Sequence, residues 1–293
     1  MDRKNFLKSF ALIPLAGFAM KINQLEKLTG SMENTERMPV FFIGHGSPMN
    51  AIELNEFSRQ WQLIGKTLPR PKAILCVSAH WETKGTLVTA MEKPRTIHDF
   101  GGFPQALFDV QYPAPGSPSL AGNARDLISS TRVGLDNSWG LDHGTWSILK
   151  HIYPAADVPV IQMSLDYSLS PRDHYELGRQ LSSLRNKGIL IMGSGNMVHN
   201  LRAVDWNHPD NGYDWAIEAN ETFKKLITEN KHQELIQFRN LGKSVDLSIP
   251  TAEHFMPQLY MLALQEKDEN ASLFNDKTVM GSLSMTSVKI GRV

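Results

Sequence analysis

Three histidines share one sequence context, in which an apolar segment runs into a short turn. Residues 40–43 (VFFI) lead through Gly44 to His45, residues 73–78 (AILCVS) lead to His80, and residues 188–192 (GILIM) lead through a glycine-rich turn to His199. Apolar runs of this kind, rich in β-branched residues, predict buried strands. Because open α/β sheets bind ligands beyond the carboxyl ends of their strands, we expect the three imidazoles to converge on one sheet edge.

A single histidine at a strand end would mean little, since a loop histidine commonly makes an ordinary hydrogen bond. Three histidines on one pattern favour a metal centre instead. Imidazole is a ligand for Zn, Fe and Cu, and it needs no special ionisation at neutral pH. We therefore interpret these histidines as candidate metal ligands.

Two loops carry aromatic and histidine side chains that suit a substrate pocket. Residues 97–104 (IHDFGGFP) contain His98, Phe100 and Phe103, and are either an ordered turn or a lid over a substrate. This loop lacks the G-x-x-x-x-G-K pattern of a phosphate-binding loop, so we do not predict nucleotide binding. Residues 139–146 (WGLDHGTW) place His143 at the start of a predicted helix, where it would face a ligand or serve as an N-terminal cap.

Near the C-terminus, residues 250–257 (PTAEHFMP) offer a carboxylate and an imidazole side by side, on Glu253 and His254. Thr251 and Glu253 suit a helix start there. Residues 278–290 contain two β-like runs, which predict a hairpin or edge strands. His174 falls in the first turn of a helix predicted to open at residues 170–173, and we expect it to be solvated.

The elements that must position these side chains predict one large α/β domain. Strand-like runs alternate with helix-like segments, such as residues 54–68 and a helix from Ser117, its N-cap, with Pro118 in the first turn. The 293 residues, 41% of them hydrophobic, are ample for a single core. Thirty basic and thirty acidic residues give zero net charge, which argues against a nucleic-acid-binding protein. The single cysteine, Cys76, lies in an apolar run and is expected to be an inert buried thiol.

Residues 1–37 do not look like part of this domain. Basic residues at positions 3, 4 and 8 precede an apolar run at 10–20, as in an export signal, and residues 3–8 resemble a twin-arginine signal with lysine in the second place. The run is too short to span a membrane. An amphipathic N-terminal helix is the alternative. Residues 21–37 are expected to be a polar linker, and the domain is expected to span 38–293. The protein would be exported to the periplasm if the segment is a signal, and cytoplasmic otherwise.

Taken together, the motifs resemble those of the class III extradiol ring-cleavage dioxygenases, in particular the 4,5-DOPA dioxygenase-like group. The stretches that carry the resemblance are GHGSPMNA (44–51), SAHWET (78–83), HDFGGFP (98–104), LDHGTW (141–146), GSGNMVHNLR (193–202) and PTAEHFMP (250–257). They occur in order across residues 38–293.

The resemblance implies a single α/β domain with a mixed central sheet flanked by helices and one divalent metal at the carboxyl ends of strands. It implies that His45, His80 and His254 are metal ligands and that His199 is a fourth histidine at the metal, an acid/base residue in related enzymes. It places His143 in the substrate pocket. The wider class commonly uses two histidines and a carboxylate, so Glu253 leaves the third ligand open.

The activity implied by the resemblance is insertion of O₂ into a catechol-type, DOPA-like ring to give a ring-opened semialdehyde. Fe(II) would support this activity, and Zn²⁺ is the other metal expected to bind. His199 would be the acid/base residue with His143 in support, while His98, Phe100, Phe103 and His143 would bind the substrate. The alternatives are a zinc-dependent hydrolase and a non-catalytic metal- or ligand-binding protein of the same fold. The expected partners are a small aromatic diol and O₂.

Overall fold

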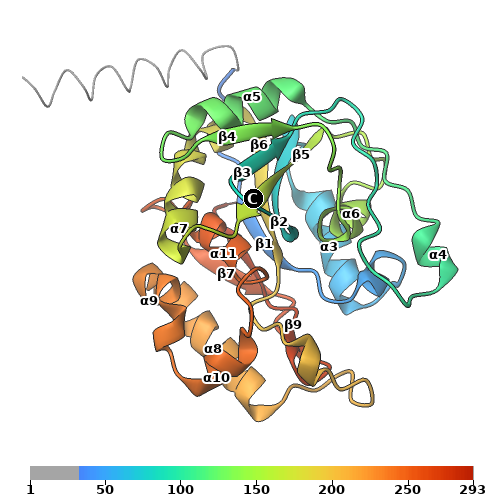
Figure 1. Ribbon diagram of the computed structural model, residues 1–293, viewed down its shortest axis with the longest axis vertical. Helices are drawn as coiled ribbons and strands as arrows, with labels where there is room; N and C mark the ends of the chain where they lie inside the picture. The colour runs from blue at the N-terminus through green and yellow to red at the C-terminus, as the bar shows by residue number, and fades with distance from the viewer. Residues whose placement is uncertain (1–32, 293) are drawn as a thin grey trace, which may run out of the picture.

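The computed structural model describes residues 33–292, and Figure 1 shows them as one α/β body around a central sheet. The strands are β1 (Val40–Gly44), β2 (Ala73–Thr83), β3 (Thr86–Thr89), β4 (Val133–Asp136), β5 (Val160–Asp166), β6 (Ile189–Gly195), β7 (Ala271–Phe274), β8 (Thr278–Val279), β9 (Leu283–Ser284) and β10 (Ser287–Ile290). The α-helices are α3 (Glu56–Thr67), α4 (Gln105–Phe108), α5 (Pro118–Leu127), α6 (His143–Ile152), α7 (Pro171–Gln180), α8 (Asp214–Thr228), α9 (His232–Ile236), α10 (Lys243–Ser248) and α11 (Met256–Leu262). Short 3₁₀ helices are η1 (Pro48–Ala51), η2 (Ser182–Lys187), η3 (Leu201–Ala203) and η4 (Phe238–Asn240).

The main sheet has eight strands in the order β4-β3-β5-β2-β6-β1-β10-β7. Its centre, β5-β2-β6-β1, is parallel. Antiparallel pairs join β3 to β5, β1 to β10 and β10 to β7. The mixed sheet expected from the resemblance is therefore confirmed.

The central strands are buried along most of their length because both faces of the sheet are covered. Every residue of β1, β5 and β6 is buried. Side chains of a strand alternate between faces, so Val40 and Phe42 join one core cluster while Phe41 and Ile43 join the other. Helices α7 and α11 pack in the first cluster and α3 and α6 in the second, as Figure 1 shows on the two sides of the central strands.

The predicted helix starts are mostly correct. Ser117 caps α5 with Pro118 in its first turn, and Asn55 and Ser170 form capping boxes at α3 and α7. The exception is the stretch near residue 251, because α11 begins only at Met256 and residues 251–255 form turns. His254 therefore lies in a turn that precedes the helix.

One other prediction was wrong, and one was correct only in part. His174 is buried rather than solvated, and its Nδ1 lies 2.9 Å from the hydroxyl of Tyr260 on α11. The reason is that the first turn of α7 faces α11, which the local sequence does not reveal. In the C-terminal segment, β8 and β9 form the predicted hairpin-like pair, but β10 lies inside the sheet between β1 and β7.

The predictions for residues 1–32 lie outside the described residues, so the export signal and the domain start near residue 38 stay predictions. Residues 33–37 were expected to be a linker, but some of them contact the domain. Thr35 N donates to Asn186 O at 2.8 Å, and Arg37 pairs with Asp268 at 3.0 Å. Among residues 33–292, no helix has the length and apolar character needed to cross a membrane.

Candidate metal centre

The carboxyl ends of β1, β6 and β2 meet at one edge of the sheet because these neighbouring strands are parallel. His45 directly follows β1, and His80 lies near the end of β2. His254 arrives from the turn before α11, and its carbonyl oxygen accepts a hydrogen bond from Asn196 N, just after β6, at 2.9 Å. Segments far apart in the sequence therefore deliver three imidazoles to one place.

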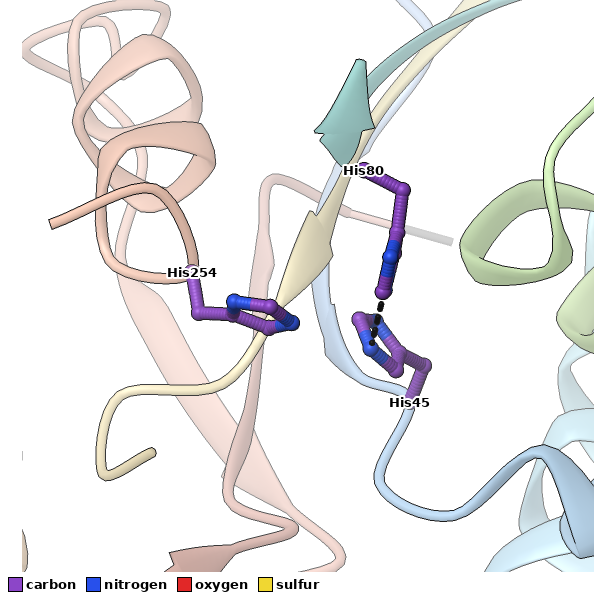
Figure 2. Close-up of side chains that lie close together, drawn as sticks. All are labelled: His45, His80 and His254. Carbon is purple, nitrogen blue, oxygen red and sulfur yellow. Dashed lines mark hydrogen bonds between the residues drawn. The ribbon is translucent and has the colours of Figure 1, made fainter. Parts of the chain in front are cut away.

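Figure 2 shows these three rings facing one another. The Nε2 atoms of His45 and His80 lie 3.1 Å apart. One ring nitrogen from each of the three histidines lies within 4.8 Å of the corresponding nitrogens of the other two. The triad is mostly buried, with His45 2% and His254 6% exposed.

The tautomer of His45 follows from its hydrogen bonds. Its Nδ1 lies 2.9 Å from the hydroxyl oxygen of Ser194, and that hydroxyl donates its single hydrogen to the carbonyl of Gly144 at 2.5 Å. Ser194 must therefore accept from His45, so the Nδ1 atom carries the hydrogen. A neutral ring with hydrogen on Nδ1 has its lone pair on Nε2, the atom that faces His80.

Carboxylates set the other two tautomers in the same way. His80 Nδ1 lies 3.1 Å from Asp99 Oδ2, and His254 Nδ1 lies 3.0 Å from Glu253 Oε1. An ionised carboxylate only accepts hydrogen bonds, so both Nδ1 atoms must carry hydrogen. In the neutral rings, the lone pairs of all three Nε2 atoms are then available to bind one cation.

These residues fit a bound cation. Nε2 of His254 is buried and has no hydrogen-bond partner among the described residues, and the Nε2 atoms of His45 and His80 face each other lone pair to lone pair. A metal ion satisfies all three nitrogens, and Nδ1 contacts to carboxylate or hydroxyl are the usual support of metal-binding histidines. Without a metal ion, burying these nitrogen lone pairs with no partner would cost folding free energy.

The pKa shifts favour the neutral, metal-binding form at two of the three rings. Burial lowers the pKa of His45 and of His254 well below the usual range, and the neighbouring imidazoles add to the effect. Burial also works against the charged form of His80, but its contact with Asp99 and the nearby charges of Asp142 and Glu253 together outweigh burial and raise its pKa. A proton on His80 is therefore the competitor of the metal.

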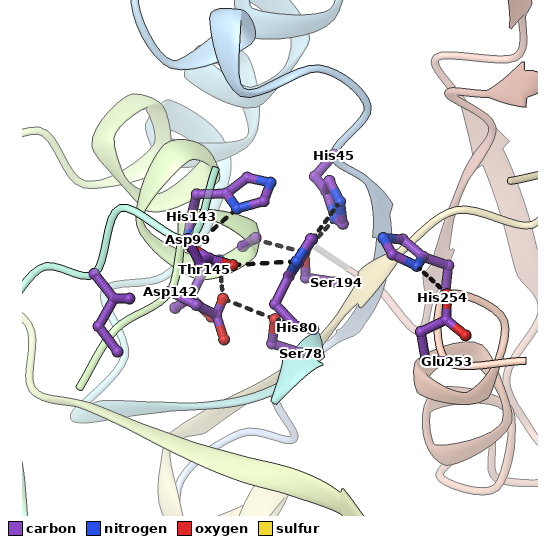
Figure 3. A network of polar contacts seen from close by, with 12 residues as sticks. His45, Ser78, His80, Asp99, Asp142, His143, Thr145, Ser194, Glu253 and His254 are labelled. Atoms are coloured by element: carbon purple, nitrogen blue, oxygen red, sulfur yellow. Dashed lines mark hydrogen bonds and ion pairs between the residues drawn. The ribbon is translucent and has the colours of Figure 1, made fainter. Parts of the chain in front are cut away.

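Asp99 is a site residue that the sequence analysis missed, although it lies in the same loop as His98 and Phe100. Burial opposes its charge, but His143 and His80 hold its pKa well below the usual range, so it is ionised. Its Oδ1 lies 3.0 Å from His143 Nδ1, while Oδ2 faces His80 (Figure 3). The signal that could have found it is an acidic residue inside a loop already rich in candidate site residues.

His143 opens α6 directly beside the triad, and its ring lies 4.0 Å from that of His80 between centroids. The N-cap of α6 is Asp142, whose Oδ1 accepts from Thr145 N at 3.1 Å, so His143 is not the cap. Burial lowers the pKa of His143, His80 adds to this, and Asp99 opposes it. The alternative that His143 itself caps the helix, which the sequence left open, is therefore wrong.

His199 lies at the rim of the triad rather than within it. Its ring stacks on that of His254, with centroids 3.4 Å apart and planes 10° apart. It groups with Glu253 and His254, whereas the three-nitrogen group of His45, His80 and His254 does not include it. Burial lowers the pKa of His199 to about 4.

The aromatic loop lies against His143. The ring of Phe100 meets the His143 ring edge-on at 5.5 Å, and Phe103 meets Phe100 at 5.6 Å. His98 is turned to a different task, because its Nε2 lies 2.9 Å from the carbonyl of Val110 and its ring lies beside Trp146. The structure thus brings Phe100 to the site, packs Phe103 against Phe100 and gives His98 contacts within the loop region.

Comparison with known proteins agrees with this geometry. Residues 40–289 match the family described as the catalytic LigB subunit of aromatic ring-opening dioxygenase. The chain belongs to this family.

Relatives of this LigB-family protein resemble it over nearly their whole length. A 4,5-DOPA dioxygenase extradiol of Escherichia coli K12 is 49% identical over 262 residues, covering 88% of this chain and 96% of the relative. A protein of the same name from Beta vulgaris is 34% identical over 277 residues, covering 89% and 98%. The crystal structure of an uncharacterized Escherichia coli K12 protein superposes with a TM-score of 0.75 at 42% identity, covering 87% of this chain and all of that one.

Membership of the LigB family implies a divalent metal and, as substrates of a ring-opening dioxygenase, an aromatic compound and O₂. The donor set found here is consistent with that metal. The identity of the metal is a separate question.

Proposed function

We propose that this protein is a metal-dependent extradiol dioxygenase that opens the ring of a catechol-type, DOPA-like substrate to a semialdehyde. The observation that carries the proposal is the convergence of three Nε2 lone pairs from His45, His80 and His254 at the sheet edge. The names of the relatives from Escherichia coli and Beta vulgaris support the substrate class.

Iron(II) is the metal we propose for the active protein, held by His45, His80 and His254. Bound there, it would supply the redox chemistry that lets O₂ and the diol react within one coordination sphere. Zn²⁺ also binds imidazole well but has no redox chemistry, so the zinc-loaded protein would be inactive as a dioxygenase.

His199 is the residue we propose for proton transfer. A diol must lose a proton when it binds, and a proton must be returned when the ring opens. With its pKa near 4, the His199 imidazole is neutral at physiological pH and accepts a proton. Its place on the face of His254, outside the three-nitrogen group, supports an acid/base role over that of a fourth ligand.

His143 and the loop of Phe100 are proposed to hold the ring of the substrate. His143 is a neutral imidazole, kept with hydrogen on Nδ1 by Asp99, so its Nε2 accepts a hydrogen bond from a diol hydroxyl. Phe100 packs edge-on against it, which gives the site an apolar wall next to its polar one. Phe103 packs edge-on against Phe100 and extends that apolar wall.

A zinc hydrolase would need a carboxylate base beside the metal, and Glu253 was the candidate in the sequence. Its Oε1 accepts from His254 Nδ1 at 3.0 Å and from the hydroxyl of Thr251 at 3.0 Å. It therefore serves the far side of the His254 ring, away from Nε2. This arrangement favours the dioxygenase.

The test is anaerobic reconstitution with Fe(II), followed by addition of DOPA, dopamine or catechol in oxygenated buffer. We expect one O₂ consumed per diol and a yellow ring-opened semialdehyde, with no turnover by the zinc-loaded protein or by His45→Ala. Hydrolysis of ester or amide substrates by the zinc form, with no ring opening by the iron form, would overturn the proposal.

A further inference from the structure

Asp99 is placed between two imidazoles that belong to different elements. Its Oδ2 lies 3.1 Å from Nδ1 of His80 on β2. Its Oδ1 lies 3.0 Å from Nδ1 of His143 and accepts a hydrogen bond from the backbone N–H of His143, at the start of α6, at 2.9 Å. One carboxylate therefore accepts one backbone hydrogen bond and lies within 3.1 Å of two ring nitrogens, which come from two separate parts of the fold.

The chemistry of the carboxylate fixes where the hydrogens lie. The ionised group has acceptors and no donor, so each ring nitrogen facing it must carry hydrogen. The neutral rings of His80 and His143, 4.0 Å apart between centroids, are then both left with their lone pairs on Nε2. One of these is a proposed metal ligand and the other lies on the substrate side.

We propose that Asp99 is a positioning residue that sets, with one carboxylate, the tautomer of a metal ligand and of the neighbouring substrate-side imidazole. The proposal rests on the proposed function for the roles of the two rings. It differs from the support given to the other ligands, because Ser194 serves the ring of His45 alone and Glu253 serves the ring of His254 alone.

Replacing the carboxylate by an amide gives an asymmetric prediction. In Asp99→Asn the amide oxygen is favoured at the Oδ1 position, where two N–H groups of His143 point, which puts the NH₂ group opposite Nδ1 of His80. An NH₂ group cannot accept a hydrogen bond, so His80 must move its hydrogen from Nδ1 to Nε2. The lone pair that faces His45 is lost from Nε2, while His143 keeps its tautomer.

The experiment reads the tautomers directly by ¹⁵N NMR of the imidazole nitrogens in metal-free protein, at an alkaline pH where both rings are neutral. His80→Gln and His143→Gln assign the signals. In Asp99→Asn we expect His80 to change to the Nε2–H form and His143 to stay Nδ1–H. Zinc affinity, measured by chelator competition, should fall about 10–100-fold, the usual effect of removing such support.

Two control variants separate positioning from general damage. Glu253→Gln should leave the tautomers of both His254 and His80 unchanged, because its amide oxygen takes the Oε1 position, where Nδ1 of His254 and the hydroxyl of Thr251 both point. His143→Phe removes the second imidazole but should keep the contact of Asp99 with His80. Its zinc affinity should therefore stay within about threefold of the wild type, a small change beside that expected for lost ligand support.

An unchanged His80 tautomer in Asp99→Asn overturns the proposal, and so does a change in both rings, which would mean that the loop had come apart. Loss of zinc affinity in His143→Phe equal to that in Asp99→Asn also overturns it. A protein with the expected tautomers that opens no catechol ring would instead refute the proposed function and leave the role of Asp99 intact.

Discussion

Replacing Ser194 by alanine removes a hydroxyl that makes two buried hydrogen bonds. It accepts from Nδ1 of His45 at 2.9 Å and donates to the carbonyl of Gly144 at 2.5 Å. Ser194 is fully buried on β6, so no solvent replaces either bond. The change leaves Nδ1 of His45 without a partner and frees its ring to adopt the other tautomer, whereas the carbonyl of Gly144 lies within α6 and keeps its helical hydrogen bond.

The size of the effect follows from the one group left unsatisfied. A buried polar group without a partner costs about 1–3 kcal/mol, so the metal-free variant should lose roughly 1–3 kcal/mol of its free energy of unfolding. Metal affinity should fall as well, by about 10–100-fold, because His45 no longer has its lone pair held on Nε2.

The assay pairs urea unfolding of the metal-free protein with chelator competition for Zn²⁺ and Fe(II). Ser284→Ala is the matched control. The hydroxyl of Ser284 is also fully buried and also has one donated and one accepted bond, to Asn220 Oδ1 at 2.6 Å and from Thr286 N at 3.2 Å. It touches no ring of the triad, so this control should lose stability and keep metal affinity. The reasoning is refuted if Ser194→Ala binds metal as tightly as Ser284→Ala does.

Three further predictions follow from the histidines. Replacing His45, His80 or His254 by alanine should sharply reduce the metal content of the purified protein. Full metal stoichiometry in all three variants would refute the ligand assignment. His199→Ala should keep most of the metal but lose kcat by roughly 10²–10⁴, and metal loss as severe as in His45→Ala would make it an obligatory ligand. Burial lowers the pKa of His174 to about 4 from 6.5. The unfolded chain therefore takes up this proton first, and as pH falls from about 6.5 to 4 the native state loses roughly 3 kcal/mol through this group. Urea unfolding of His174→Gln should show a smaller loss over that pH range than the wild type, and an equal loss would contradict the assignment.

The sequence predicted those parts of the site that are encoded locally. The apolar runs before His45 and His80 specify strands, and parallel neighbours necessarily bring their ends together. Asp99 could not be assigned from its loop, because its role depends on which rings the folded chain places within 3.1 Å of each carboxylate oxygen.

The same limit explains the errors in the fold. The sequence around His174 is polar and typical of a solvated first turn, but the packing of α7 against α11 buries the ring beside Tyr260. Likewise, residues 287–290 have a strand pattern, but periodicity does not reveal a strand's neighbours. The place of β10 inside the sheet comes from pairing with β1, at the other end of the domain.

That pairing gives the chain an order of assembly. Val40 pairs with Ile290, so the strand that leads to His45 gains its second neighbour only when almost the whole polypeptide has been made. Contacts between such distant residues form slowly, since a long loop must close first. A chain that ends before residue 287 would expose β1 as an open sheet edge, a surface prone to aggregation. Metal binding at the proposed site would then mark a chain that has reached β10, because the strand that leads to His45 gains its last partner there.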